Sequence, residues 1–263
     1  MRIAMTYIKS FLKNPALYIS VLCCTVIALW GVISAGNFTS VDACVQYIEF
    51  SGIAPLFGNM LDYSTYRKLI LIVACMPFTA RFCTELKSGF SLSVILRNSK
   101  ESYILTHAVL NFLFTFLVSF LGIVLCAVVL LFFFPLIGEV GNEYFGTFNQ
   151  LMNNENTAWL FILLKSLFFS ISLGAWSVSG AAISAVFPDP FIAICTPLIM
   201  SYILELVTIE VGFLPDLWNL SRGYGCSSDN ILFASLEIVF VFIALAVLFG
   251  TIFYYIAERK LKR

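Results

Sequence analysis

The run ILTHAVLNFLFTFLVSFLGIVLCAVVLLFFFPLI, residues 104–137, contains no Asp, Glu, Lys or Arg. A helix that crosses a bilayer needs about 20 mainly apolar residues. This run exceeds that length, so a helix formed by it must tilt or project beyond the bilayer. The stretch therefore predicts a membrane-spanning helix.

The composition of the whole chain supports the same conclusion. Of its 263 residues, 60% are hydrophobic and only 11% are charged, whereas soluble domains are roughly 45–50% apolar and about 25% charged. With so few charges, most of the surface must face lipid. The length suits one transmembrane domain, residues 1–263, with no room for a separate soluble domain of ordinary size.

Five further apolar runs flank the first one along the chain. Pro77 and Arg81 interrupt the shortest run, and Pro188 and Pro190 predict a tight turn between two others, because proline lacks the backbone donor that a helix needs. We expect an all-α integral membrane protein with six spans, at about 17–35, 69–83, 104–137, 158–186, 191–209 and 231–257.

The distribution of basic residues predicts that both termini are cytoplasmic, because cytoplasmic segments carry an excess of Lys and Arg. Ten basic residues fall on the predicted cytoplasmic side and three on the external side. The cytoplasmic ten are Arg2, Lys9, Lys13, Lys87, Arg97, Lys100, Arg259, Lys260, Lys262 and Arg263, and the external three are Arg67, Lys68 and Arg222.

Two cytoplasmic segments are amphipathic. In residues 2–13, one helical face gathers Ile3, Tyr7, Ile8, Phe11 and Leu12. This pattern predicts an interfacial helix that lies on the inner leaflet before the first span. Residues 84–103, between the second and third spans, combine many polar residues with an apolar face.

The second segment reads ELKSGFSLSVILRNSKESYILTH over residues 85–107. It resembles the loop after the second span in type-2 ABC exporter permeases, where a Glu-x-x-x-Gly precedes an aliphatic stretch, a short basic and polar turn and the third span. The likeness of sequence covers about twenty positions, while the predicted layout matches over nearly the full length. The family often has a lysine where the third span begins, and His107 stands there in this chain.

The resemblance implies a coupling helix that docks on a cytosolic ATPase and transmits its movement to the spans. An apolar ridge would dock, flanking charges would set its register and a glycine would permit a bend. Leu86, Phe90 and Val94 would form the ridge. Glu85 and Arg97 would supply the flanking charges, and Gly89 would permit the bend. The alternative is an amphipathic loop that only lies on the inner leaflet.

Besides Arg81, three charged residues lie within predicted spans, where an unpaired charge is costly. Lys165, Glu205 and Glu237 each fall five to eight residues from the external end of a span, so a rise of about 1.5 Å per residue places them at a similar depth. We expect Lys165 to pair with Glu205 or Glu237. The pair would be part of an outer gate or, alternatively, a structural ion pair.

The cysteines do not follow a metal-binding pattern, because no Cys-x-x-Cys occurs and most of them lie in apolar runs. Cys44 and Cys226 fall in predicted external loops. They either form a disulfide or remain two thiols.

No recognised catalytic motif points to an enzyme. The chain lacks the Gly-x-x-x-x-Gly-Lys-Ser/Thr loop that cradles ATP phosphates. Ser177 and Ser179 suggest a serine protease only superficially, since a serine nucleophile needs a base and the single histidine, His107, is predicted near the opposite leaflet. The small residues at 174–182 favour close helix packing instead.

We therefore expect the permease subunit of an ATP-driven exporter in a bacterial plasma membrane. ATP and magnesium would be bound by two copies of a separate ATPase, with no cofactor in this chain and no role for nucleic acid. A second permease subunit, identical or paralogous, would complete the pathway for an amphipathic or hydrophobic peptide, drug or lipid-like cargo. The alternatives are a secondary transporter and an accessory or immunity membrane protein.

Overall fold

A computed structural model describes residues 2–35, 41–63, 65–97, 99–138, 147–153, 155–211 and 215–261. Within these ranges all regular secondary structure is helical. Five helices are long and apolar enough to cross a membrane, which supports a multi-pass membrane protein. They are α2 (Pro15–Ala35), α8 (Lys100–Leu131), α9 (Glu155–Val186), α10 (Pro190–Val211) and α12 (Ile231–Leu261).

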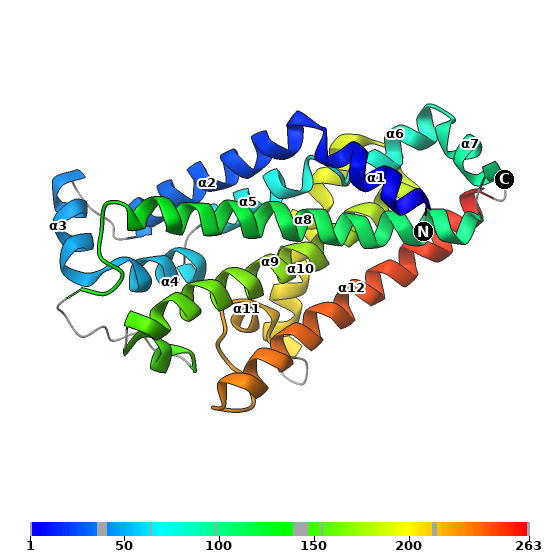
Figure 1. The fold of residues 1–263 in the computed structure, drawn as a ribbon. Coiled ribbons are helices and arrows are strands. Elements are labelled where there is room, and N and C mark those ends of the chain that lie inside the picture. The colour runs from blue at the N-terminus through cyan, green and yellow to red at the C-terminus, as the bar shows by residue number, and fades with distance from the viewer. Residues whose placement is uncertain are drawn as a thin grey trace.

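Helix α9 is the centre of the bundle and contacts α8, α10 and α12 along its length (Figure 1). In its most apolar stretch 72% of the residues are buried, against 17% in α12. Small residues allow this close packing, as the sequence predicts. A Cβ on Gly180, for example, would overlap the backbone oxygen of Ala193 in α10.

The predicted span 69–83 is not one continuous helix. It is divided into α5 (Tyr66–Cys75) and α6 (Arg81–Lys87), with a turn at residues 76–80 that contains Pro77. Proline has no N–H to continue the helical ladder. The turn is held by Thr79, whose hydroxyl donates to Oδ1 of Asn111 in α8 at 2.8 Å.

Residues 36–68 were expected to be an external loop, but most of them are helical. The helices are α3 (Val41–Ser51) and α4 (Ile53–Tyr63), and nearly all described side chains of α4 are buried against the bundle. The backbone N–H groups of Ile53 and Ala54 donate to the carbonyls of Pro135 and Leu136, each at 3.1 Å. Because the first N–H groups of a helix have no partner within it, these bonds fix the start of α4 to the segment that follows α8.

Two short helices lie at the opposite end from α3 and α4, where both chain termini are also found (Figure 1). They are α1 (Arg2–Leu12) and α7 (Phe90–Arg97). The N-terminal helix is present as predicted, and its apolar face is divided, because Ile8 and Leu12 are exposed while other side chains pack on protein. Tyr7 and Phe11 are buried, and the Phe11 ring stacks on Phe114 of α8 with centroids 3.6 Å apart.

Gly52 connects α3 to α4, and its substitution tests how closely this connection packs on the segment that follows α8. Its φ is +82°, and a Cβ would overlap the backbone of Ile137 and Gly138. We expect Gly52→Ala to destabilise the protein by more than the roughly 1–2 kcal/mol of a left-handed alanine, as measured by thermal unfolding in detergent. Gly89→Ala is the control, because its φ is also positive but its Cβ would meet nothing within 4 Å; equal losses would contradict the packing described for α4.

Candidate functional site

Six charged side chains from five segments come together inside the half of the bundle that lies away from the chain termini, and each is at most 9% exposed. We call them the buried charge cluster. Its members are Asp62 of α4, Arg67 and Lys68 of α5, Lys165 of α9, Glu205 of α10 and Arg222, which follows α11 (Leu217–Leu220).

Lys165 forms an ion pair with Asp62, with Nζ 3.1 Å from both carboxylate oxygens. The same Nζ donates to the backbone carbonyl of Arg222. Tyr224 donates its hydroxyl to Asp62 Oδ2 at 2.9 Å. The pair therefore holds α4, α9 and the segment after α11 together.

The expectation that Lys165 pairs with Glu205 or Glu237 is wrong. Glu205 pairs with Lys68, whose Nζ lies 2.7 Å from Oε2 and also donates to Ser201 at 3.0 Å. Glu237 accepts hydrogen bonds from the backbone N–H and the hydroxyl of Ser227, at 2.8 and 2.7 Å. The partners were misassigned because Asp62 and Lys68 were placed in an external loop, whereas α4 and α5 carry them into the bundle.

Arg67 and Arg222 pack against aromatic rings. The guanidinium carbon of Arg222 lies 3.8 Å from the ring centroid of Trp218, and that of Arg67 lies 5.0 Å from the same centroid. Arg67 also donates to the Ser221 hydroxyl at 2.7 Å. Cation–π contacts of this kind stabilise a desolvated guanidinium. Trp218 therefore holds the segment at 217–224 against the cluster.

The cluster joins α4 and α5 on one side to α9, α10 and the segment at 217–224 on the other. Two ion pairs cross this boundary, Lys165–Asp62 and Lys68–Glu205. Separating buried partners leaves uncompensated charges, which costs several kcal/mol. The arrangement can thus hold these segments together at this end of the bundle. Among the described residues no group of His, Cys, Asp or Glu is arranged to bind a metal ion.

Glu85 is the centre of a second polar site, at the end where the chain termini lie. Its carboxylate accepts hydrogen bonds from the hydroxyls of Tyr7 at 2.6 Å and Tyr103 at 3.0 Å. Arg81 Nε lies 2.9 Å from it, and His107 Nε2 lies 3.1 Å from it. Burial alone would raise the pKa of Glu85, but the hydrogen bonds from His107, Tyr7 and Arg81 lower it to about 2.

The resemblance gives Glu85 the role of a flanking charge in docking, but its side chain is only 6% exposed and lies within the bundle. The Glu-x-x-x-Gly sequence gives no sign of this, since the tyrosines that bind Glu85 are distant in sequence. What the carboxylate does is attach α6 to α1 and α8.

The rest of the predicted coupling segment is divided between surface and core. Gly89 bends the chain with φ +71°, and Leu86 and Val94 are half-buried against the core. The large apolar side chains that α7 exposes are Phe90, as predicted, together with Leu92 and Leu96; Arg97 is also exposed.

The remaining predicted residues take part in other contacts. The side chain of Cys44 lies outside the described residues, and Cys226 is a free cysteine in the structure, which favours two thiols over a disulfide. The hydroxyl of Ser177 donates to the backbone carbonyls of Gly174 and Asn111, at 2.7 and 3.3 Å. His107, the single histidine and so the only one that could serve a serine as a base, contacts Glu85.

No family model matches the chain, and no curated protein or solved structure matches it either.

The Lys165–Asp62 pair makes a quantitative prediction. We expect Lys165→Met and Asp62→Asn each to lower the free energy of unfolding by about 3–5 kcal/mol, because each leaves a buried charge without its partner. The double variant should lose less than the sum of the two, as measured by denaturant unfolding in detergent micelles. Glu237→Gln is the control and should cost below about 1 kcal/mol. Additive losses in the double variant would show that the two residues are not coupled.

The Glu85 site predicts how α1 is held. In Glu85→Ala, trypsin should cleave after the exposed Lys9 and Lys13 roughly tenfold faster, because hydrogen bonds to a charged group contribute about 1.5–3 kcal/mol each. Glu101→Ala, at the exposed start of α8, should cleave as the wild type does. The lowered pKa means that the contribution of Glu85 is present above about pH 4.5 and lost toward pH 2. Release of α1 from the wild type on moving from pH 7 to 5 would contradict this assignment.

Proposed function

We propose that the chain is the permease subunit of an ATP-driven exporter in a bacterial plasma membrane and that α7 docks on a separate ATPase. The observation that carries the proposal is the exposed apolar surface of α7. Phe90, Leu92 and Leu96 are 51%, 62% and 87% exposed, on a helix that projects from the end of the bundle (Figure 1). Such a surface, rimmed by polar residues, is typical of protein–protein contact.

The attachment of α7 supports transmission of movement into the bundle. A bend at Gly89 separates α7 from α6, and Glu85 of α6 contacts Tyr7 of α1 and Tyr103 of α8. A push on α7 would therefore be received by two other helices. A loop that only lies on the leaflet has no need of a buried carboxylate with four polar partners.

The placement of charge supports a cytoplasmic location for this end of the protein. Lys9, Lys87, Arg97 and Lys100 belong to the helices gathered there, as do the basic residues that end α12. The positive-inside tendency favours the cytoplasm for such an end. In this orientation the segment from α4 through α5 serves as the sixth, broken crossing.

The buried charge cluster would then be an outer gate. A pathway opening to the outside must separate α5 from α10 or α4 from α9, and each separation breaks one ion pair. The cost of breaking buried pairs gives a reason for driving the step with ATP. Two ATPase copies, a second permease subunit and an amphipathic or hydrophobic cargo complete this proposal.

An ion-coupled secondary transporter is the second candidate, and the same cluster favours it. Such transporters place charged residues where helices are interrupted inside the membrane. Here Asp62 and Lys68 flank the break between α4 and α5. The two candidates differ in whether the purified assembly hydrolyses ATP or responds to an ion gradient.

Substitution of Leu92 tests the ATP-driven exporter against the secondary transporter. We expect the tagged wild-type chain, captured from its native membranes in mild detergent, to retain a chain with an ATP-binding loop and to hydrolyse ATP. Leu92→Asp should lower retention at least about tenfold, because a carboxylate in an apolar contact costs more than about 1.4 kcal/mol. The ATP-binding chain is quantified by mass spectrometry and its activity by phosphate release.

Leu92→Met is the matched control, since it keeps the apolar contact at nearly the same volume. Leu92 is exposed, so both variants should unfold at the wild-type temperature. Equal retention in the Asp variant would overturn docking through α7. Substrate movement driven by a proton or sodium gradient, with no ATP hydrolysis in the captured material, would favour the secondary transporter.

A further inference from the structure

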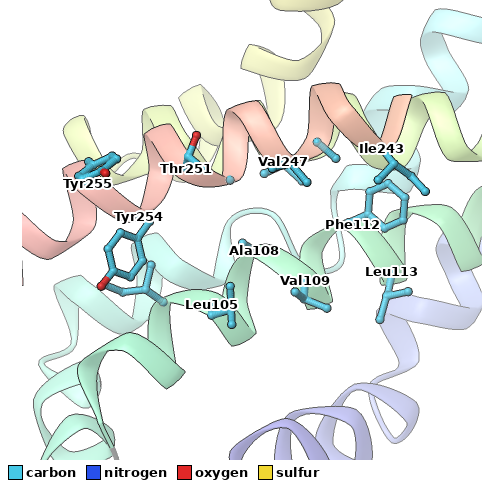
Figure 2. A pocket seen from close by; sticks show the side chains of 14 residues that line it. Leu105, Ala108, Val109, Phe112, Leu113, Ile243, Val247, Thr251, Tyr254 and Tyr255 are labelled. Atoms are coloured by element: carbon cyan, nitrogen blue, oxygen red, sulfur yellow. The ribbon is translucent and has the colours of Figure 1, made fainter. Parts of the chain in front are cut away.

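A groove of about 470 Å³ lies between α8 and α12, with Val178 of α9 at its base. Figure 2 shows the side chains of the two helices facing one another across it, with Leu105 and Val109 on α8 and Val247 on α12. The volume lies within the range of about 300–1,000 Å³ that is usual for small-molecule sites.

The groove opens onto lipid. Both of its walls belong to helices that are long and apolar enough to cross the membrane. Along the rim, Leu105, Val109 and Val247 are exposed, so their outer surfaces are covered by hydrocarbon in a bilayer. The molecules at highest local concentration at this opening are therefore lipid acyl chains.

Gly250 indicates that the space is maintained. It lines the groove in the middle of α12, where a glycine costs roughly 1 kcal/mol relative to alanine. A Cβ at this position would meet nothing within 4 Å, so no neighbouring protein atom requires a glycine. Gly174 and Gly180 differ, because a Cβ there would press on Phe112 or on Ala193. The missing side chain at Gly250 therefore leaves room in the groove for an occupant that is not part of the protein.

The groove lining is almost entirely apolar, but hydroxyl-bearing residues gather at one end (Figure 2). The hydroxyl-bearing residues Thr251, Tyr254 and Tyr255 line it, and Figure 2 shows the two tyrosines together at that end. Arg259 lies one helical turn beyond Tyr255 on the same face of α12 and is exposed. An apolar channel that ends in hydroxyls and a guanidinium matches a hydrocarbon tail attached to a phosphate.

We propose that the groove between α8 and α12 holds one acyl chain of a phospholipid, with the phosphate of its headgroup near Arg259. The site does not depend on the proposed transport function, because it requires only the packing of α8, α9 and α12. The bound chain fills space beside Val178 that protein atoms leave empty. The site is therefore distinct from general lipid contact around the bundle.

A photoactivatable phosphatidylglycerol with a diazirine in one acyl chain tests the proposal. The probe is reconstituted with the purified protein in phosphatidylcholine vesicles, and the labelled peptides are identified by mass spectrometry. We expect labelling to concentrate on groove residues such as Val109 and Val247. Gly250→Leu should lower that labelling at least about tenfold, because the new side chain occupies the groove.

Ala244→Leu is the matched control, because Ala244 is exposed on α12 outside the groove. It adds a similar side chain in the same helix and should leave groove labelling unchanged. Both variants should keep the wild-type unfolding temperature or exceed it, since neither leucine meets a close contact at Gly250 or at an exposed site. Unchanged groove labelling in Gly250→Leu, labelling spread evenly over all exposed faces, or cross-links between two protein chains through this groove would overturn the proposal.

Discussion

The requirement that a charge inside an apolar bundle be partnered governs the half of this protein that contains α4, α5 and the buried charge cluster. Lys165 and Lys68 are buried among helices surrounded by hydrocarbon, and each contacts a carboxylate, Asp62 or Glu205. An unpartnered ion there would cost several kcal/mol. The positions of α4 and α5 are consequently restricted to those that bring Asp62 to α9 and Lys68 to α10. Hydrophobic packing alone would allow these short helices to slide, whereas the two ion pairs do not.

The sequence is sufficient to predict the five long helices, because an uninterrupted apolar run above about 20 residues has few alternatives. It fails for α3 and α4, which are 11 residues each. Helices this short are stabilised by tertiary contacts rather than by their own residues. The start of α4 is fixed by carbonyls at 135–136, far away in sequence. The polar residues at 59–68 then look like an external loop when burial is not known.

The charged residues illustrate the same limit. That Lys165 and Glu205 need partners follows from their apolar surroundings, and both have one. Which residues serve as those partners depends on where α4 and α5 lie, and no local sequence pattern reveals that. Glu85 is a parallel case, because an amphipathic segment shows that one face is buried without showing what covers it. Here Tyr7 of α1 covers it, from 78 residues away in the chain.

The segment from α4 to α6 is interrupted twice, and a polar contact lies at each interruption. Asp62 and Lys68 flank the first, and Thr79 at the second donates to Asn111, which in turn donates to the backbone carbonyl of Ser177 in α9. A break frees backbone groups that lipid cannot satisfy, so neighbouring polar side chains must stand beside it. Three short helices, each held to a neighbouring long helix by polar contacts, therefore stand where a single straight helix would otherwise cross.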